Sequence, residues 1–413
     1  MLRLDIEVEI ANGFVKGFCD PDFQPVADEF VANFAAKEVG ASLCVTLDGE
    51  TVVDLWGGVK AGKEKTSWNK DTMCVVFSCT KGATALCANR LIDQGKLDLH
   101  EPVATYWPEF AAQGKDMVSV EMMLNHTAGV PALREPLDEG GYCDWGYMVD
   151  RLSQEAPFWE PGTRNGYHMM TFGWTVGELV RRVSGKSLGT YFREEIAEPL
   201  GLDFWIGLPD DEHDRVSRMM RWRPGKNEPV SPFTQALLTD RKSLPYLAFM
   251  NSGGHKTDSA EAYRAELGGG GGIANARGLA GMYTPLANGG THAGISVISI
   301  DQIERMRRTS VATMQDATLL MPTRFGLGFM KSMDNRHRPS GALESMVIGH
   351  DAFGHAGAGG SLGFADPSAK LAFGYAMNQM GAGILLNERG QSLVDATYKA
   401  MGYRTNMTGA WIK

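Results

Sequence analysis

Apolar and polar residues alternate with two different periods along the chain, and these periods predict helices and strands in different places. In residues 22–39 the apolar side chains recur every three or four positions, which predicts an amphipathic helix. The next two segments, residues 41–47 and 51–56, are apolar and flank Asp48 and Gly49, a pair typical of a tight hairpin turn. A helix followed by a β-hairpin is therefore expected near the N-terminus.

The rest of the chain shows a helical stretch followed by a return to strands. Residues 100–275 have mostly helical patterns separated by long loops that contain proline and glycine. Strand-like segments follow at residues 324–331, 360–365 and 370–377, and residues 385–401 have the pattern of a final helix.

This order predicts an α/β architecture with an added helical part. An antiparallel sheet flanked by helices is expected from both chain ends, residues 1–99 and 276–413, with a mostly α-helical domain, residues 100–275, inserted between them. A crevice between two such parts is the usual place for a small-molecule site. The active site is therefore expected there.

Ser78 and Lys81 are the most informative residues in this pattern. A strand-like stretch leads into Ser78, and the helical spacing of residues 83–92 begins directly behind it. Side chains three positions apart share one face of a helix, and an amine in an apolar pocket can take the proton of a neighbouring hydroxyl. The pair therefore predicts a serine nucleophile with a local base. A second Ser-x-x-Lys, at residues 67–70, lies in a polar stretch and is interpreted as loop.

Two later segments provide further candidates. Tyr167 stands where a loop containing Pro161 and Gly162 leads into a helical pattern at residues 171–180. His355 lies in a run of small residues of the kind that lets a substrate approach the backbone of a strand. On the residues alone, Ser78 could also be an ordinary helix-cap serine followed by an exposed lysine.

Taken in order, Ser78-x-x-Lys81, Tyr167 and His355-Ala356-Gly357 resemble the penicillin-recognising serine hydrolases, which have a β-lactamase/transpeptidase-like fold. The pattern is most similar to that of the carboxylesterases of family VIII type, which are related to class C β-lactamases. The likeness covers nearly the whole chain, because three further segments resemble the same family: residues 124–129, 268–272 and 324–329.

The resemblance assigns roles to individual residues. It implies that Ser78 is acylated, that Lys81 and Tyr167 share the proton transfers, and that His355 lies on a sheet-edge strand that lines the pocket. The backbone N–H groups of Ser78 and Ala358 would form the oxyanion hole. An ammonium on Lys81 is expected to favour an ionised Tyr167, which would then protonate the leaving alkoxide and later activate water.

Two departures from the β-lactamase pattern bear on the substrate. Where the lactamases have Tyr-x-Asn, this chain has Met169 in place of the asparagine, so a thioether replaces the amide. Where they have Lys-Thr-Gly, this chain begins the motif with His355 and loses a fixed positive charge and a hydroxyl. Both changes favour an esterase over a strong β-lactamase. The expected substrate contacts are His355, Gly357, Met169 and, as a wall of the acyl site, Trp159.

The predicted function is a serine carboxylesterase that hydrolyses short- to medium-chain esters through an acyl-enzyme. An acyltransferase, an amidase or D-aminopeptidase, and a weak β-lactamase would use the same residues. An alternative of another class is a catalytically inactive ligand-binding relative. The chemistry requires no cofactor, and no metal site is predicted because His350 and His355 lack carboxylate or cysteine neighbours at metal-binding spacing.

Composition narrows the partners and the compartment. The 413 residues are 43% hydrophobic, enough for a sizeable core, and the net charge of −9 is spread without blocks. This charge argues against nucleic acid and anionic membranes as partners and suits a small neutral ester. Residues 1–9 interleave charged and apolar side chains, so they lack the uninterrupted apolar stretch that marks a secretory signal. Six cysteines are too few for a disulfide scaffold. A cytoplasmic protein is therefore expected. The oligomeric state has no signal in the sequence.

Three other motifs have less specific interpretations. Ser361 lies in a Gly-x-Ser-x-Gly pattern, but no histidine follows His355 and no helix follows Ser361, so a nucleophile elbow is not predicted. The glycine run at residues 268–272 lacks the register of a phosphate-binding loop and is interpreted as a domain crossover or pocket-edge loop, with Asn275 capping the next helix. His126 is expected to be a structural, hydrogen-bonded histidine.

Overall fold

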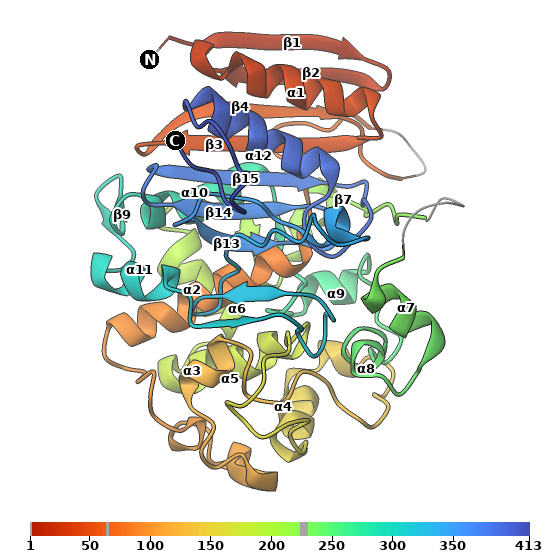
Figure 1. Ribbon diagram of the computed structural model, residues 1–413, viewed down its shortest axis with the longest axis vertical. Helices are drawn as coiled ribbons and strands as arrows, with labels where there is room; N and C mark the ends of the chain where they lie inside the picture. The colour runs from red at the N-terminus through yellow and green to blue at the C-terminus, as the bar shows by residue number, and fades with distance from the viewer. Residues whose placement is uncertain (1, 63–65, 224–229) are drawn as a thin grey trace.

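A seven-stranded antiparallel sheet forms the upper half of the molecule in Figure 1. The computed structural model describes residues 2–62, 66–223 and 230–413. The strand order is β1-β2-β4-β3-β15-β14-β13. The bounds are β1 Leu4–Ile10, β2 Gly13–Cys19, β3 Gly40–Leu47, β4 Glu50–Gly58, β13 Phe353–Ala356, β14 Leu362–Asp366 and β15 Leu371–Met377. The sheet thus takes its strands from both chain ends, as the sequence predicts.

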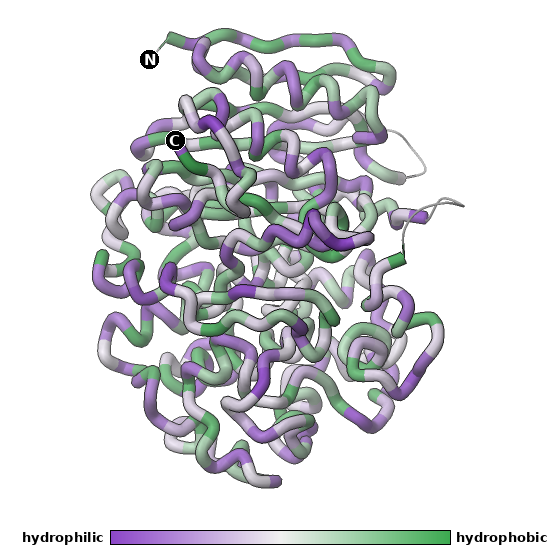
Figure 2. The backbone as a smooth tube through the Cα atoms, viewed as in Figure 1, coloured by the Kyte–Doolittle hydropathy of each residue, from purple (hydrophilic) through white to green (hydrophobic). Residues whose placement is uncertain are grey.

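The predicted hairpin is β3–β4, in which Leu47 pairs with Glu50. Asp48 and Gly49 both have positive φ, 51° and 83°, as a tight two-residue hairpin turn requires. A second hairpin, β1–β2, was not predicted. Strand β1 follows the alternation of period two that marks a strand, visible along the outermost strand in Figure 2. The sequence expectation for this segment concerned only a signal peptide and named no strand.

Helices cover both faces of the sheet. On β15, Phe373 and Tyr375 belong to the apolar cluster shared with α1 Gln24–Ala35 and α12 Glu388–Ala400. Between them, Gly374 turns toward α10 Ala276–Ala287 on the other face, where a Cβ would lie 2.2 Å from the Ala276 carbonyl oxygen. α1 and α12 contact each other (Figure 1) and match the helices predicted at residues 22–39 and 385–401, with shorter bounds.

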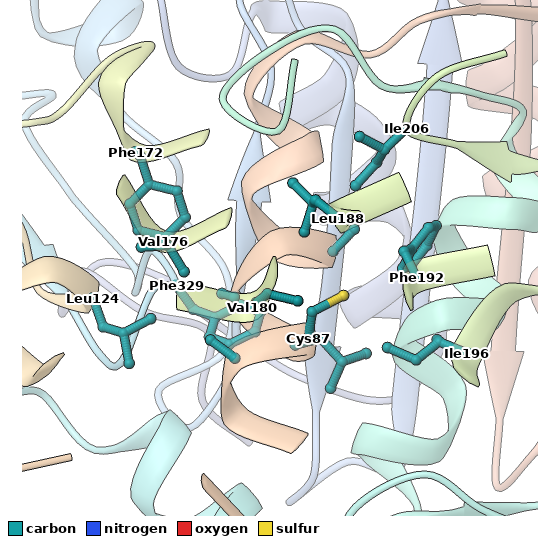
Figure 3. Packing of buried hydrophobic residues seen from close by; sticks show 14 of the residues in the cluster. Cys87, Leu124, Phe172, Val176, Val180, Leu188, Phe192, Ile196, Ile206 and Phe329 are labelled. Carbon is teal, nitrogen blue, oxygen red and sulfur yellow. The ribbon is translucent and has the colours of Figure 1, made fainter. Parts of the chain in front are cut away.

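The lower half of Figure 1 is largely helical, and α2 Thr80–Asp93 packs at its centre. Apolar side chains of α5 and α6 gather around α2 near Cys87 (Figure 3). The other helices of this half are α5, which is as long as α2, and several shorter ones. Their bounds are α3 Val120–Leu124, α4 Trp145–Gln154, α5 Thr171–Ser184, α6 Leu188–Phe192, α7 Pro232–Thr239, α8 Leu244–Met250 and α9 Ala260–Arg264.

Smaller strands join these parts. Four form a sheet in the order β6-β8-β5-β7: β5 Met73–Val75, β6 Phe204–Trp205, β7 Val216–Ser217 and β8 Ile273–Ala274. β9 Thr291–His292 pairs with β10 Ile295–Ser296 before α11 Ile300–Arg307, and β11 Val311–Thr313 pairs with β12 Thr323–Phe325. Among the described residues, none of the helices combines the length and apolar composition that a membrane crossing requires.

One predicted strand is mostly wrong. Of the predicted strand 324–331, only the first two residues lie in a strand, β12 Thr323–Phe325, because the chain then turns tightly. Gly328 has φ of 86°, and the Gly326 amide donates a hydrogen bond to the carbonyl of Phe329. The two glycines of this segment thus take part in a turn rather than a strand. The domain bounds at residues 99/100 and 275/276 stay a prediction.

Candidate active site

Ser78 lies in a tight turn between a strand and a helix. β5 ends at Val75, the 3₁₀ turn Phe77–Cys79 follows, and α2 begins at Thr80. Phe77 has φ of 46°, a left-handed conformation that costs free energy in a residue with a bulky side chain. The Thr80 hydroxyl donates to the Phe77 carbonyl at 2.5 Å, which helps to hold this turn. The predicted transition from strand to helix is present, with Ser78 just before the helix.

Lys81 is fully buried, and its amine has three oxygen neighbours. Nζ lies 2.5 Å from the carbonyl oxygens of Met169 and Gly269 and 3.2 Å from Ser78 Oγ. Burial lowers the pKa of Lys81 well below its usual value. Lys81 Nζ donates to Ser78 Oγ when the amine is charged; in the neutral form the two carbonyls would take both N–H donors, and the lone pair would be left for the Ser78 hydroxyl. The burial of Lys81 excludes the interpretation of Ser78 as a cap serine beside an exposed lysine.

Tyr167 joins the pair from the helical part of the chain. The Lys81 Nζ atom lies 4.7 Å from the centre of the Tyr167 ring. Burial raises the pKa of the Tyr167 phenol above its usual value, and a hydrogen bond with Ser78 opposes this rise only in part. Burial therefore favours the neutral form of both groups, which is the opposite direction from the expected ionised tyrosine beside an ammonium.

His355 completes this cluster from strand β13. Its Nδ1 lies 2.9 Å from the Ala356 carbonyl oxygen, which can only accept, so Nδ1 carries the proton. Burial and the nearby Lys81 lower the pKa of His355 to about 3. Its Nε2 lone pair faces the Tyr167 hydroxyl at 3.5 Å. His355 is thus a neutral acceptor beside the phenol, where the lactamase pattern has a lysine.

The segment after β13, residues 357–361, is called the oxyanion loop below because it contains Ala358. Gly357 lies against the strand that leads to Ser78, since a Cβ there would be 2.3 Å from the Val76 carbonyl oxygen. The Asn387 side chain donates to the Gly359 carbonyl at 2.5 Å. Within the described residues, the Ala358 amide has no hydrogen-bond acceptor. The oxyanion role of Ser78 and Ala358 stays a prediction.

Met169 and Trp159 have structural contacts that the sequence did not suggest. The carbonyl of Met169, rather than its thioether, contacts Lys81, and the side chain is 6% exposed. The Trp159 indole N–H donates to the Thr127 carbonyl at 3.2 Å, and its ring packs against Gly166. Both residues therefore hold the neighbours of the cluster in place. Contacts of Met169, Trp159 and Gly357 with a substrate remain predictions.

The glycine run lies along the start of α2. The carbonyl of Gly268 accepts a hydrogen bond from Thr84 at 2.9 Å, and Gly269 accepts from Lys81. Gly272 accepts from the Val76 amide and donates to Thr80. The run therefore packs on the start of α2, and its interpretation as a domain crossover or pocket-edge loop stays a prediction.

Other sequence interpretations have mixed outcomes. Asn275 caps α10 through the Gly278 amide, as predicted. The Ser361 hydroxyl is buried with no hydrogen-bond partner among the described residues, and strand β14 follows it, which does not fit a nucleophile elbow. His126 Nδ1 accepts from the His168 amide at 3.2 Å, in line with a structural histidine. In the part of the chain that the structure describes, no cluster of three or more His, Cys, Asp or Glu side chains could hold a metal ion.

Sequence reasoning missed Asp316. Its carboxylate is fully buried and accepts the backbone N–H of Tyr167, with both oxygens 3.0 Å from the nitrogen. Asp316 belongs to no short motif, and it lies 149 positions from Tyr167 in the sequence. No local signal marks such a contact.

Residues 27–394 match the protein family described as Beta-lactamase. The chain is 34% identical to an esterase/beta-lactamase, LipL, of Mycobacterium tuberculosis, over 91% of this chain and 85% of that protein. It is 25% identical to an N-acetylmuramyl-L-alanine amidase of Bacillus subtilis, over 94% of this chain and 86% of the amidase.

Two solved structures are similar over the same length. One is a family VIII carboxylesterase, with a TM-score of 0.82 and 39% identity over 94% of this chain and 99% of that chain. The other is a penicillin-binding protein homolog from Caulobacter crescentus, with a TM-score of 0.81 and 36% identity over 94% and 99%. These likenesses confirm the predicted β-lactamase/transpeptidase-like fold.

Proposed function

Because this chain belongs to the β-lactamase family, we propose that it is a serine carboxylesterase that cleaves short- to medium-chain esters through an acyl-enzyme. One observation carries the proposal. A fully buried Lys81 holds Nζ 3.2 Å from Ser78 Oγ, and its other hydrogen bonds leave a lone pair for the serine proton. The similarity to an esterase/beta-lactamase and to a family VIII carboxylesterase supports the ester as substrate.

Acylation begins with proton transfer from Ser78 to Lys81 while Oγ attacks the ester carbonyl carbon. The carbonyl π electrons move to oxygen, and the N–H groups of Ser78 and Ala358 stabilise the resulting oxyanion. The tetrahedral intermediate collapses as the bond to the alkoxide breaks. Tyr167 gives its proton to that alkoxide and recovers one from the Lys81 ammonium. Water then attacks the acyl-enzyme, with the same groups moving protons in reverse order.

The charges around the site favour a neutral substrate. His355 is neutral near pH 7 because its pKa is about 3, and the Met169 side chain offers no hydrogen-bond donor. His355 therefore lacks the fixed positive charge that could hold a carboxylate, and Met169 lacks the side-chain amide that would bind a substrate amide.

The test combines labelling and turnover in the purified protein. Ser78→Ala is expected to fold, to lose hydrolysis of p-nitrophenyl butyrate and to lose labelling by a fluorophosphonate. Ser67→Ala, in the other Ser-x-x-Lys, is the matched control and should keep both. If Ser78→Ala still turns over or is still labelled, Ser78 is not the nucleophile. No labelling of the unaltered protein would favour the inactive ligand-binding relative.

Substrate comparison separates the remaining alternatives. Butyrate esters should be hydrolysed faster than nitrocefin, small amides and long-chain esters. The similarity to LipL, whose name includes both activities, makes slow nitrocefin hydrolysis a second candidate activity. An added alcohol acceptor should yield little transester compared with free acid. A larger transester product would identify an acyltransferase.

A further inference from the structure

Asp316 is a buried carboxylate that reaches the proposed site from a loop between β11 and β12. Its side chain is 0% exposed. Besides the Tyr167 amide, Oδ1 accepts the amides of Thr318 and Leu319 at 2.8 and 2.9 Å, and Oδ2 accepts the Thr323 hydroxyl at 3.2 Å. The carboxylate therefore joins its own loop to the loop that carries Tyr167.

The surroundings of Asp316 suit a carboxylate that only accepts hydrogen bonds. Three of its four partners are backbone N–H groups, which can only donate. Burial raises the pKa of Asp316, and these donors oppose that rise. Within the described residues, no lysine, arginine or histidine forms an ion pair with it. The carboxylate thus depends on these N–H donors for its stabilisation, and one of them belongs to Tyr167.

Neighbouring hydrogen bonds fix the same loop. The Asn165 carbonyl accepts from the Ala317 amide at 3.0 Å, and its side-chain oxygen, 3.0 Å from the Thr323 hydroxyl, shares that single hydroxyl proton with Asp316 Oδ2. The Gly166 amide donates to the His126 carbonyl at 3.1 Å. The backbone before Tyr167 is therefore held from both sides. A change in the direction of the Tyr167 Cα–Cβ bond would displace the phenol oxygen at the far end of the ring.

We propose that Asp316 is a positioning residue for Tyr167: its carboxylate anchors the Tyr167 amide so that the phenol hydroxyl stays between Ser78 and His355. The inference rests on the proposed function, because it assigns Asp316 a role through the proton transfers of Tyr167. Asp316 itself contacts no reacting atom. Its contribution belongs to kcat, since displacement of a proton donor by about 1 Å can lower a rate by roughly a hundredfold.

Two substitutions separate the geometry from the charge. Asp316→Asn keeps one oxygen for the amides of Tyr167, Thr318 and Leu319 and can donate to the Thr323 hydroxyl, so the anchor persists. Asp316→Ala removes the anchor. Asp316→Ala is expected to lower kcat for p-nitrophenyl butyrate by about tenfold to a hundredfold with KM changed less than about threefold, and Asp316→Asn to lower it less than about tenfold.

A matched control addresses the loss of any buried carboxylate. Asp366 is also buried and accepts the Tyr398 hydroxyl at 2.8 Å, but it lies at the end of β14 away from the oxyanion loop. Asp366→Asn should lower the melting temperature with kcat changed less than about twofold below the transition. Circular dichroism at the assay temperature shows whether each variant is folded. If Asp316→Ala does not fold, the kcat of Asp316→Asn, alone and combined with Tyr167→Phe, is used for the test instead.

A double-mutant cycle with Tyr167→Phe decides between positioning and general structural support. If Asp316 acts through the phenol hydroxyl, its substitution should change kcat less than about twofold once that hydroxyl is absent. An equal loss of kcat in both backgrounds would overturn the inference and leave the proposed function intact. Full activity of Tyr167→Phe alone would instead contradict the proposed role of Tyr167.

Discussion

Replacing Lys81 by methionine should change how the stability of the protein depends on pH. Lys81 is 0% exposed, and burial lowers its pKa well below the usual value. In the unfolded chain the same amine titrates near about 10.4. Between these two pKa values the unfolded state binds one proton more than the folded state. Methionine has a similar length and binds no proton in either state.

Proton linkage gives the sign and the size of the change in the free energy of unfolding with pH. Stability rises with pH wherever the unfolded state binds more protons, by about 1.4 kcal/mol per pH unit for one proton. The pH-dependent part of the folding stability that comes from Lys81 is fully present above about pH 10.4. It is lost as the pH falls toward the pKa of Lys81 in the folded protein. The free energy of unfolding of the unaltered protein should therefore rise relative to that of Lys81→Met by about 1.4 kcal/mol per unit within this window.

A second contribution is independent of pH. Methionine leaves the carbonyl oxygens of Met169 and Gly269 without their donor, at a cost of about 1 to 3 kcal/mol each. This cost offsets part of the gain from removing a buried amine, so the absolute difference at one pH is not diagnostic. The slope of the difference against pH is diagnostic.

Guanidinium denaturation followed by circular dichroism at pH 7, 8, 9 and 10 measures this slope. Lys96→Met is the matched control, because Lys96 lies just beyond α2 and is exposed, and its difference should stay flat. The Lys81→Met protein should also lose esterase turnover by more than about a thousandfold, as expected for a base that acts as a unit with its nucleophile. A flat difference for Lys81→Met would mean that the folded protein holds a charged Lys81, and the neutral-base mechanism would be refuted.

Three further predictions concern residues that support the site. Gly82→Ala places a Cβ 2.2 Å from the Tyr283 hydroxyl and should therefore destabilise the protein by about 1 to 3 kcal/mol. The double variant with Tyr283→Phe removes that hydroxyl and should recover part of the melting temperature. Arg389→Met leaves the Glu38 carboxylate buried without its partner at 2.6 Å and should cost about 3 to 5 kcal/mol in denaturant unfolding, whereas an unchanged midpoint would contradict the pairing. Asn387→Asp keeps the cap of α12 but loses the donor to the oxyanion loop, so its kcat should fall about tenfold. Asn387→Ala should in addition lose about 1 kcal/mol of stability, because it also removes the cap. An unchanged kcat in Asn387→Asp would exclude a role for this hydrogen bond.

The sequence predicted features that depend on short-range patterns. The spacing of Ser78 and Lys81 is local, and the helical pattern behind it correctly indicated a buried helix start, although an exposed lysine stayed open on the residues alone. The turn at Asp48 and Gly49 was equally local. Tyr167 and His355 were found by resemblance to a family, because each stands alone in its segment. The structure brings these four residues together, whereas their catalytic roles stay predictions.

Features that depend on contacts between distant segments were missed. Asp316 anchors Tyr167 across 149 positions, and nothing near it in the sequence differs from an ordinary loop aspartate. The direction of the Tyr167 pKa shift was also missed, since it depends on burial by the surrounding fold, whereas a lowered pKa for a lysine in an apolar pocket was anticipated. The β1–β2 hairpin was missed for a different reason. Its alternating pattern is local and present in residues 4–10, so this miss has no long-range cause.

Reactivity in this site comes at a cost in stability, which explains why its support comes from distant segments. A bulky residue in the left-handed region, as at Phe77, costs on the order of 1 to 3 kcal/mol, and a buried amine adds to that cost. Besides the local hydrogen bond from Thr80 to Phe77, contacts from distant segments support this turn and its neighbours. The Val76 amide is bound by Gly272, the Lys81 amine by Met169 and Gly269, and the Tyr167 amide by Asp316. Substitutions in these supports should therefore lower activity before they unfold the protein, because strained conformations relax first when their restraints are removed.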